Sequence, residues 1–214
     1  MLERLSKNVK ITLSILFCFI GLALITYTYF DGIKSNLFNQ KNIELLEQEI
    51  VISEELEEID EEVPTTTRVV TNPVSNEDRR DNYIGYLEVP DVNIKRGFVA
   101  MDSKYNSVGY NVMLIKGSEM PDVKNGNLIL AAHRGNSSVS FFDKLYKLNM
   151  GAEASVTYNN KKYTYKLKYT YTVPKVGKIT ISRNGDINTL TLITCTRNDK
   201  KTQTVFIFEL ESVK

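Results

Sequence analysis

Residues 162–173 alternate strictly between apolar or aromatic side chains and polar ones, and this pattern constrains the fold more than any other stretch of the chain. Every second residue from Tyr163 to Val173 is apolar or aromatic, and the residues between them are Lys or Thr. Successive side chains of a β-strand point to opposite faces, so a period of two indicates a strand with one buried face and one solvated face. The chain therefore contains a β-rich domain.

Further short strands are expected around this one. Asn159–Asn160 predicts a hairpin turn that joins a strand at Ala154–Tyr158 to the alternating stretch. Residues Phe141–Leu148 are expected to form a short helix. Many short strands at this spacing predict an all-β barrel or sandwich of about 130 residues, beginning near Asn82. The other predicted strands are Ile84–Val89, Leu128–Ala132, Leu190–Cys195 and Thr204–Leu210.

Residues 11–30 carry no charged side chain, and as an α-helix they are long enough to cross a hydrocarbon core of roughly 30 Å. Arg4, Lys7 and Lys10 precede this run, and Asp31 follows it. Because basic residues favour the cytoplasmic side, the sequence predicts a single-pass membrane protein with residues 1–10 in the cytoplasm and the rest exported. The alternative is a cleaved signal peptide, but the run is longer than usual for one and no A-x-A-like site follows it.

Residues 31–81 separate the apolar run from the predicted domain at residues 82–214. Residues 31–80 hold 5 basic and 13 acidic groups, whereas residues 81–214 hold 19 basic and 12 acidic groups. Dense like charges at residues 54–62 repel one another, so an isolated helix would be marginal here and a solvated stalk is expected. Pro64 and Asn72–Pro73 should interrupt any regular element. The alternative is that the acidic segment docks on the basic domain as a regulatory cover.

The chain has two cysteines and one histidine, and this limits the chemistry of the exported part. Cys18 lies in the apolar run, so Cys195 has no disulfide partner and a disulfide scaffold is excluded. Cys195 and His133 supply too few ligands for a structural zinc site, so the sequence predicts no metal and no cofactor. A basic exported domain can contact anionic wall polymers, and nucleic acid is not an expected partner.

His133 and Cys195 each stand at the end of a predicted apolar strand, and adjacent strand ends of a barrel converge on one rim. A thiolate that attacks a carbonyl carbon needs a neighbouring acid–base group, and a cation or a backbone N–H to stabilise the oxyanion. Histidine suits the first role, and Arg134 or Arg197 is close enough in sequence for the second. However, a lone Cys or His is commonly structural, so a non-catalytic, membrane-tethered interaction module stays open on these residues alone.

Three stretches resemble the sortase family. Thr191–Cys195 reads TLITC and matches the TLxTC motif, Ala132–Arg134 matches the region around the catalytic His, and Ile84–Pro90 resembles the opening strand. The resemblance covers residues 82–212, and a membrane anchor with a stalk ahead of the domain also fits the family. It implies a closed eight-stranded β-barrel and a surface transpeptidase of mainly Gram-positive bacteria.

The resemblance also implies roles for individual residues. Cys195 would cleave an LPXTG-like sorting signal of a surface protein between Thr and Gly and form a thioacyl enzyme. His133 would protonate the leaving amine and deprotonate the incoming one, and Thr194 and Ala132 would bind substrate. The acceptor amine would belong to a peptidoglycan precursor or to a pilin lysine.

One position departs from the family pattern. Sortases carry an essential Arg at or just before the start of the last strand, where this chain reads Lys200–Thr204. Arg197 is the favoured replacement, with Lys201 or Gln203 as alternatives, although Lys cannot reproduce the bidentate guanidinium fork. A papain-like or amidase-type cysteine hydrolase is disfavoured, because those families place Cys before His in the chain.

Overall fold

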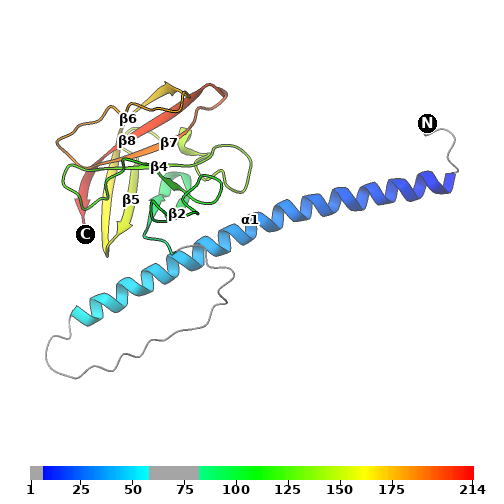
Figure 1. Ribbon diagram of the computed structural model, residues 1–214, viewed down its shortest axis with the longest axis horizontal. Helices are drawn as coiled ribbons and strands as arrows, with labels where there is room; N and C mark the ends of the chain where they lie inside the picture. The colour runs from blue at the N-terminus through cyan, green and yellow to red at the C-terminus, as the bar shows by residue number, and fades with distance from the viewer. Residues whose placement is uncertain (1–6, 58–81) are drawn as a thin grey trace. The chain divides into compact units, whose positions relative to one another are not determined.

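The computed structural model describes residues 7–57 and 82–214, and it places one long helix, α1 (Lys7–Glu57), ahead of a set of β-strands (Figure 1). The chain divides into two compact units, Met1–Phe38 and Asn39–Lys214, so the last part of α1 belongs to the same unit as the strands. Within the described residues, α1 is the one helix long and apolar enough to cross a membrane, by length and composition. Its apolar side chains in the first unit are exposed, as at Phe19 and Ile25. This is consistent with a membrane anchor or a signal sequence.

Eight strands form one sheet in the order β2-β1-β5-β6-β8-β7-β4-β3, which curls into a nearly closed barrel. This confirms the predicted eight-stranded architecture. Every neighbouring pair is antiparallel except β4 and β7, which run parallel. The strands are β1 (Gly85–Val89), β2 (Ile94–Phe98), β3 (Met113–Leu114), β4 (Asn127–Ala131), β5 (Glu153–Tyr158), β6 (Lys161–Pro174), β7 (Thr189–Cys195) and β8 (Thr202–Val213).

The six strands expected from the sequence correspond to β1, β4, β5, β6, β7 and β8. The predicted hairpin turn is also present, because Asn159 and Asn160 both have positive φ, 47° and 58°. Two successive residues with positive φ are typical of the type I′ turn, whose twist matches that of the strands it joins. The strands β2 and β3 were not predicted.

The prediction of a helix over Phe141–Leu148 is wrong in length, because only η3 (Leu145–Lys147), a single 3₁₀ turn, is helical there. A second 3₁₀ turn, η2 (Pro90–Val92), lies between β1 and β2. Phe142 and Leu145 are fully buried and Leu148 packs on the same core. Their spacing of three residues also occurs on one face of an α-helix, so the apolar pattern alone predicts a longer helix than the one that forms.

The barrel has apolar side chains on both sides of its wall. On β7, Leu190 and Leu192 point into the interior core, whereas Ile193 belongs to a second cluster on the outer face. Segment 175–188, between β6 and β7, packs on this second cluster through Ile179 and Ile181. The hydroxyl of Tyr169 donates to the carbonyl of Ser182 at 2.9 Å and holds the segment in place. This outer face is built from Ile129, Ala131, Ile193, Val205, Ile207, Tyr169, Tyr171 and Val173.

The last part of α1 packs on β1 and β2 through residues four apart. Asn39 and Ile43 are buried, and Ile43 joins a cluster with Tyr83, Tyr86 and Val99. Gly97 of β2 allows this packing, because a Cβ there would lie 1.9 Å from the ring of Tyr83. The described part of the acidic segment, residues 31–57, is therefore helical, where a solvated stalk was expected. Pro64 and Asn72–Pro73 lie outside the described residues.

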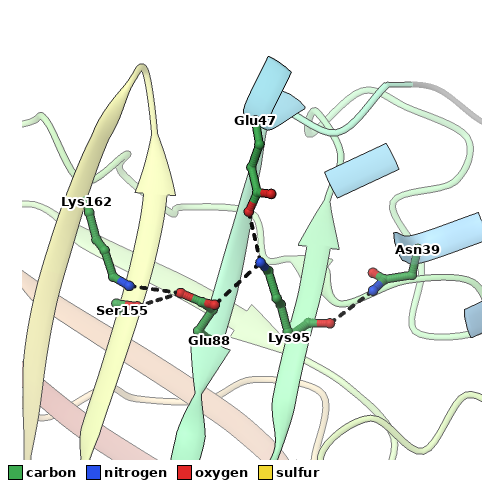
Figure 2. A network of polar contacts seen from close by, with 6 residues as sticks. All are labelled: Asn39, Glu47, Glu88, Lys95, Ser155 and Lys162. Carbon is green, nitrogen blue, oxygen red and sulfur yellow. Dashed lines mark hydrogen bonds and ion pairs between the residues drawn. The ribbon is translucent and has the colours of Figure 1, made fainter. Parts of the chain in front are cut away.

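Asn39 completes the free edge of β2. Its Nδ2 donates to the carbonyl of Lys95 at 3.0 Å, and its Oδ1 accepts the backbone N–H of Gly97 at 3.1 Å (Figure 2 draws the first of these bonds). Tyr83 also donates its hydroxyl to Asn39 Oδ1 at 3.3 Å. One side-chain amide thus pairs with a donor and an acceptor that a neighbouring strand would otherwise take, which protects the edge from pairing with another chain.

Charged side chains continue this contact across the sheet (Figure 2). Lys95 Nζ lies 2.8 Å from Glu47 Oε1 and 3.7 Å from Glu88 Oε1, and Lys162 Nζ lies 3.0 Å from Glu88 Oε2. Burial alone lowers the pKa of Lys95, but the hydrogen bond with Glu47 and the attraction of both carboxylates outweigh it and raise the pKa. Glu47 is one residue of the acidic segment, and its contact with Lys95 of β2 is of the kind that the alternative expectation describes, an acidic residue docked on the domain.

Candidate active site

The parallel pairing of β4 and β7 brings together the strand ends from which the two predicted catalytic residues follow. The partners run from Asn127 opposite Thr189 to Ala131 opposite Ile193, a constant offset along five pairs. The backbone N–H of Ala132 still donates to the carbonyl of Ile193 at 3.3 Å. The strand pairing ends there, and the same offset continued by two residues would bring His133 opposite Cys195.

The side chain of Cys195 belongs to the outer face of the barrel. Residues of a strand alternate between faces, and Ile193, two residues before Cys195 on β7, is part of the outer cluster. His133 is the second residue after the end of β4, and it is exposed. On the far side of β7, Cys195 pairs with Gln203 of β8, and Gln203 in turn pairs with Val173 of β6. The site is thus one end of the outer face, across four adjacent strands.

Ala132 and Thr194, the predicted substrate-binding residues, directly precede His133 and Cys195 in the chain, and Ala132 is part of the interior core. Both are buried, with exposed fractions of 5% and 4%. The hydroxyl of Thr194 donates to the carbonyl of Ala132 at 3.0 Å, a side-chain bond between the two strands at the residue before Cys195. This buried hydrogen bond adds to the backbone pairing of the two strands at the residue before Cys195.

The thiol of Cys195 is half-buried and has a cation beside it. Lys175 Nζ donates to Cys195 Sγ at 3.7 Å, within the range of hydrogen bonds to sulfur. Lys175 follows directly after β6, and its backbone N–H donates to the carbonyl of Lys201 at 2.8 Å. The strand pairing of β6 with β8 therefore continues to Lys175 and carries its side chain to the thiol.

His133 is held through its backbone, and its ring is exposed. The carbonyl of His133 accepts the backbone N–H of Phe142 at 3.1 Å, and Phe142 is fully buried in the interior core. Within residues 7–57 and 82–214, the imidazole has no hydrogen-bond partner. A ring attached to a fixed backbone, with both nitrogens available, suits proton transfer to and from a bound substrate.

Arg197 and Arg134 both lie over the ring of Tyr146. Arg197 Cζ is 4.2 Å and Arg134 Cζ is 5.7 Å from the ring centroid of Tyr146. Arg134 also donates from Nη1 to the carbonyl of Thr196 at 3.4 Å, which ties the residue after His133 to the residue after Cys195. A guanidinium over an aromatic face is attracted by the ring and held in orientation.

The β7–β8 loop that carries Arg197 is closed by Asp199. Asp199 Oδ2 accepts the hydroxyl of Thr202 at 2.7 Å, and its Oδ1 accepts the backbone N–H of Lys201 at 2.8 Å. These two hydrogen bonds lower the pKa of Asp199 below its ordinary value. The carboxylate therefore stays ionised at neutral pH and keeps the short loop in one conformation.

Sequence reasoning missed two residues of this site, Lys175 and Tyr146. Lys175 lies 20 residues before Cys195 and reaches it only through the strand pairing of β6 with β8. Tyr146 lies in the 3₁₀ turn that replaced the expected helix. No local pattern distinguishes either from the other lysines and tyrosines of the chain, so the tertiary contact is the signal that finds them.

Comparisons with known proteins agree with this geometry. The family model described as "Sortase domain" matches residues 87–211. Among solved structures, sortase A of Listeria monocytogenes has 21% identity and a TM-score of 0.52, over 63% of this chain and 90% of that one. A Clostridium perfringens sortase D5 transpeptidase has 21% identity and a TM-score of 0.51, over 61% and 80% of the two chains. Sortase C1 of Streptococcus agalactiae has 25% identity and a TM-score of 0.54, over 61% and 68%. None of the curated protein sequences compared with this chain matches it.

Proposed function

Because the chain belongs to the sortase family, a family of cysteine transpeptidases, we propose that Cys195 attacks the scissile carbonyl of a sorting signal and forms a thioacyl enzyme. The observation that supports this proposal is the register of β4 and β7: its offset, continued by two residues beyond the last pair, Ala131 and Ile193, would bring His133 opposite Cys195. Covalent catalysis suits a transfer reaction, because the thioester keeps the free energy of the cleaved bond for the second amine.

His133 is the acid–base group of the proposed reaction. It gives a proton to the amine that leaves when the tetrahedral intermediate collapses, and it removes a proton from the amine that attacks the thioester. Its ring is exposed and therefore open to either amine. The acceptor amine of the proposal is that of a peptidoglycan precursor or a pilin lysine.

Arg197 is proposed to bind the carbonyl oxygen or the backbone of the sorting signal. Its guanidinium stacks on Tyr146, and it belongs to the loop that begins directly after Cys195. Thr194 and Ala132 keep their predicted role at the substrate-binding end of the strands, where their hydrogen bond fixes the positions of Cys195 and His133. The proposed sorting signal is LPXTG-like and belongs to surface proteins.

The proposal also keeps the predicted division of the chain. Residues 1–10 lie in the cytoplasm, residues 11–30 form a single membrane anchor, residues 31–81 form a linking segment, and residues 82–214 form an extracellular catalytic domain. Protease added to intact protoplasts should remove the catalytic domain while leaving the N-terminus with the cells. Protection of the domain, or its release as a soluble form starting after residue 30, contradicts this arrangement.

The decisive test is capture of the thioacyl enzyme. The full chain in detergent is incubated with a panel of pentapeptide sorting signals, and the mass of the protein is measured. We expect one peptide to add its N-terminal part to wild-type protein, and no adduct in Cys195→Ala, because only the reacting atom is lost. Undiminished transfer by Cys195→Ala would remove the proposed mechanism.

A further inference from the structure

We propose that Lys175 is a catalytic residue whose ammonium group pairs with the thiolate of Cys195. It supplies a cation to the sulfur from the end of β6, while Arg197 keeps its proposed role of binding the carbonyl oxygen or the backbone of the sorting signal. This inference rests on the proposed function, since it assigns a role within the same reaction. The contact that carries it is the hydrogen bond from Lys175 Nζ to Cys195 Sγ at 3.7 Å.

The backbone of Lys175 is held on both sides of the residue. Its own N–H donates to the carbonyl of Lys201, and the next residue, Val176, donates its N–H to the carbonyl of Pro174 at 3.1 Å. Tyr169, Tyr171 and Val173 alternate onto the outer face, so Lys175 continues the same row. The side chain is thus directed to the face that carries the thiol.

The other candidates near Cys195 have different partners. Arg197 stacks on Tyr146, and Arg134 bonds the carbonyl of Thr196. Gln203, opposite Cys195 on β8, carries no charge. Among the residues that the structure describes, Lys175 is the one whose side chain has a hydrogen bond with the thiol sulfur.

No carboxylate of the described residues forms an ion pair with Lys175, in contrast to Lys95, Lys162, Lys166 and Lys168. Its charge is therefore not offset by an acidic neighbour in the described part of the chain. A cation beside a cysteine favours the thiolate, which is the nucleophilic form. Because Lys175 is exposed, the attraction is weakened by water and by salt, and its size is expected to be modest.

In the proposed step, the thiolate of Cys195 attacks the scissile carbonyl beside the ammonium group of Lys175. The thiol proton has moved to His133, so the reacting state holds a Cys195 thiolate, a His133 imidazolium and a Lys175 ammonium. A sulfur lone pair forms the C–S bond with the scissile carbonyl carbon, and the π electrons of the carbonyl move onto its oxygen. When the C–N bond breaks, the amine leaves with the proton of His133. Lys175 keeps its three protons throughout and contributes charge only.

The test measures the thiol before any substrate is involved. Full-length protein in detergent is treated with iodoacetamide, an uncharged reagent, and the peptide that contains Cys195 is quantified by mass spectrometry over a range of pH. We expect Lys175→Met to slow alkylation about fivefold near neutral pH, because the cation that contacts the sulfur is lost. Lys175→Arg should restore most of the rate, and about 1 M salt should reduce the difference.

Lys178→Met is the matched control, because it removes the same charge from the same exposed segment. It should alkylate like wild type. Equal alkylation of Lys175→Met and wild type at low salt, with thioacyl formation intact in both, would overturn the role of Lys175 and leave the proposed function standing. A wild-type Cys195 that neither alkylates nor forms the thioacyl enzyme would overturn both.

Discussion

The α1–β2 contact and the Cys195 end of the outer face are both built from polar side chains at strand edges, but they use these groups in opposite ways. At the first, Asn39 makes three hydrogen bonds, and Lys95 lies between two carboxylates. At the second, the imidazole of His133 has no partner among the described residues. Nε of Arg134 is buried without a hydrogen bond, and its nearest carboxylate, Asp143, is 4.0 Å away.

We infer from this difference that the α1–β2 contact contributes to folding stability and that the Cys195 end contributes to the reaction. Saturated polar groups have little left to offer a ligand, and their loss is expected to appear in the free energy of unfolding. Groups without internal partners contribute little to folding and remain available for a substrate. The variants below test this division, since each should change one property and leave the other.

His133→Ala should have the largest effect on turnover and none on unfolding. Removal of a general acid–base group typically costs 10²–10⁴-fold, and no other imidazole exists in the chain to replace it, so kcat/KM for transpeptidation should fall about 10³-fold. Peptide cleavage and transfer are followed by mass spectrometry, and urea unfolding serves as the control. Normal turnover in this variant would remove His133 from the mechanism.

Arg197→Lys should follow, with a loss of roughly 10²-fold in thioacyl formation, because the charge is kept but the planar fork is lost. Lys201→Ala and Gln203→Ala should lose much less in the same assay. The opposite ranking, with Arg197→Ala close to wild type and either of the other two inactive, would show that the usual family position has kept the role with a different side chain. Circular dichroism of each variant checks that it is folded.

Asn39→Ala should reduce stability and leave activity unchanged, the opposite of the two preceding variants. Truncation leaves the backbone groups of Lys95 and Gly97 without their side-chain partner, and a buried group without a partner costs about 1–3 kcal/mol. We expect a loss of about 2 kcal/mol in the free energy of unfolding, with thioacyl formation unchanged well below the melting temperature. Gln40→Ala, an exposed neighbour on the same helix, is the control. A loss of activity without a loss of stability would break the comparison.

The Glu47–Lys95 pair should have the smallest effect. Both side chains are close to half exposed, so a double-mutant cycle of Glu47→Gln and Lys95→Met should give a coupling of about 0.5 kcal/mol. The pKa of Lys95 is raised in the folded protein. The stabilisation that protonated Lys95 gives the folded state is therefore complete below the ordinary lysine pKa of 10.5, and it is lost as the pH rises through the raised value. The coupling measured near pH 8 should therefore exceed that near pH 11. A coupling that is unchanged at alkaline pH would argue against an ionic contact.

Six of the eight strands were predictable from the sequence. The other two, β2 and β3, lack the alternation of apolar and polar residues on which the prediction depends. β2 reads Ile-Lys-Arg-Gly-Phe, with two adjacent charges and a glycine in place of an alternating pattern, and β3 has two residues. Of the two charges of β2, Lys95 pairs with Glu47 of α1 and Glu88 of β1, and Arg96 lies over the ring of Phe141. A strand stabilised by distant partners carries no signal of its own.

The sequence by itself determined the elements in which buried and solvated side chains alternate regularly, such as β6. It also determined the apolar run of membrane-spanning length and the positions of His133 and Cys195 at two predicted strand ends. Only the tertiary structure decided what lies beside those elements. Lys175 reaches Cys195 through the register of β6 on β8, and Asn39 reaches Lys95 across 56 residues of chain. The physical reason is that side-chain periodicity reports which face of an element is buried, whereas register depends on backbone pairing between strands that the local sequence does not encode.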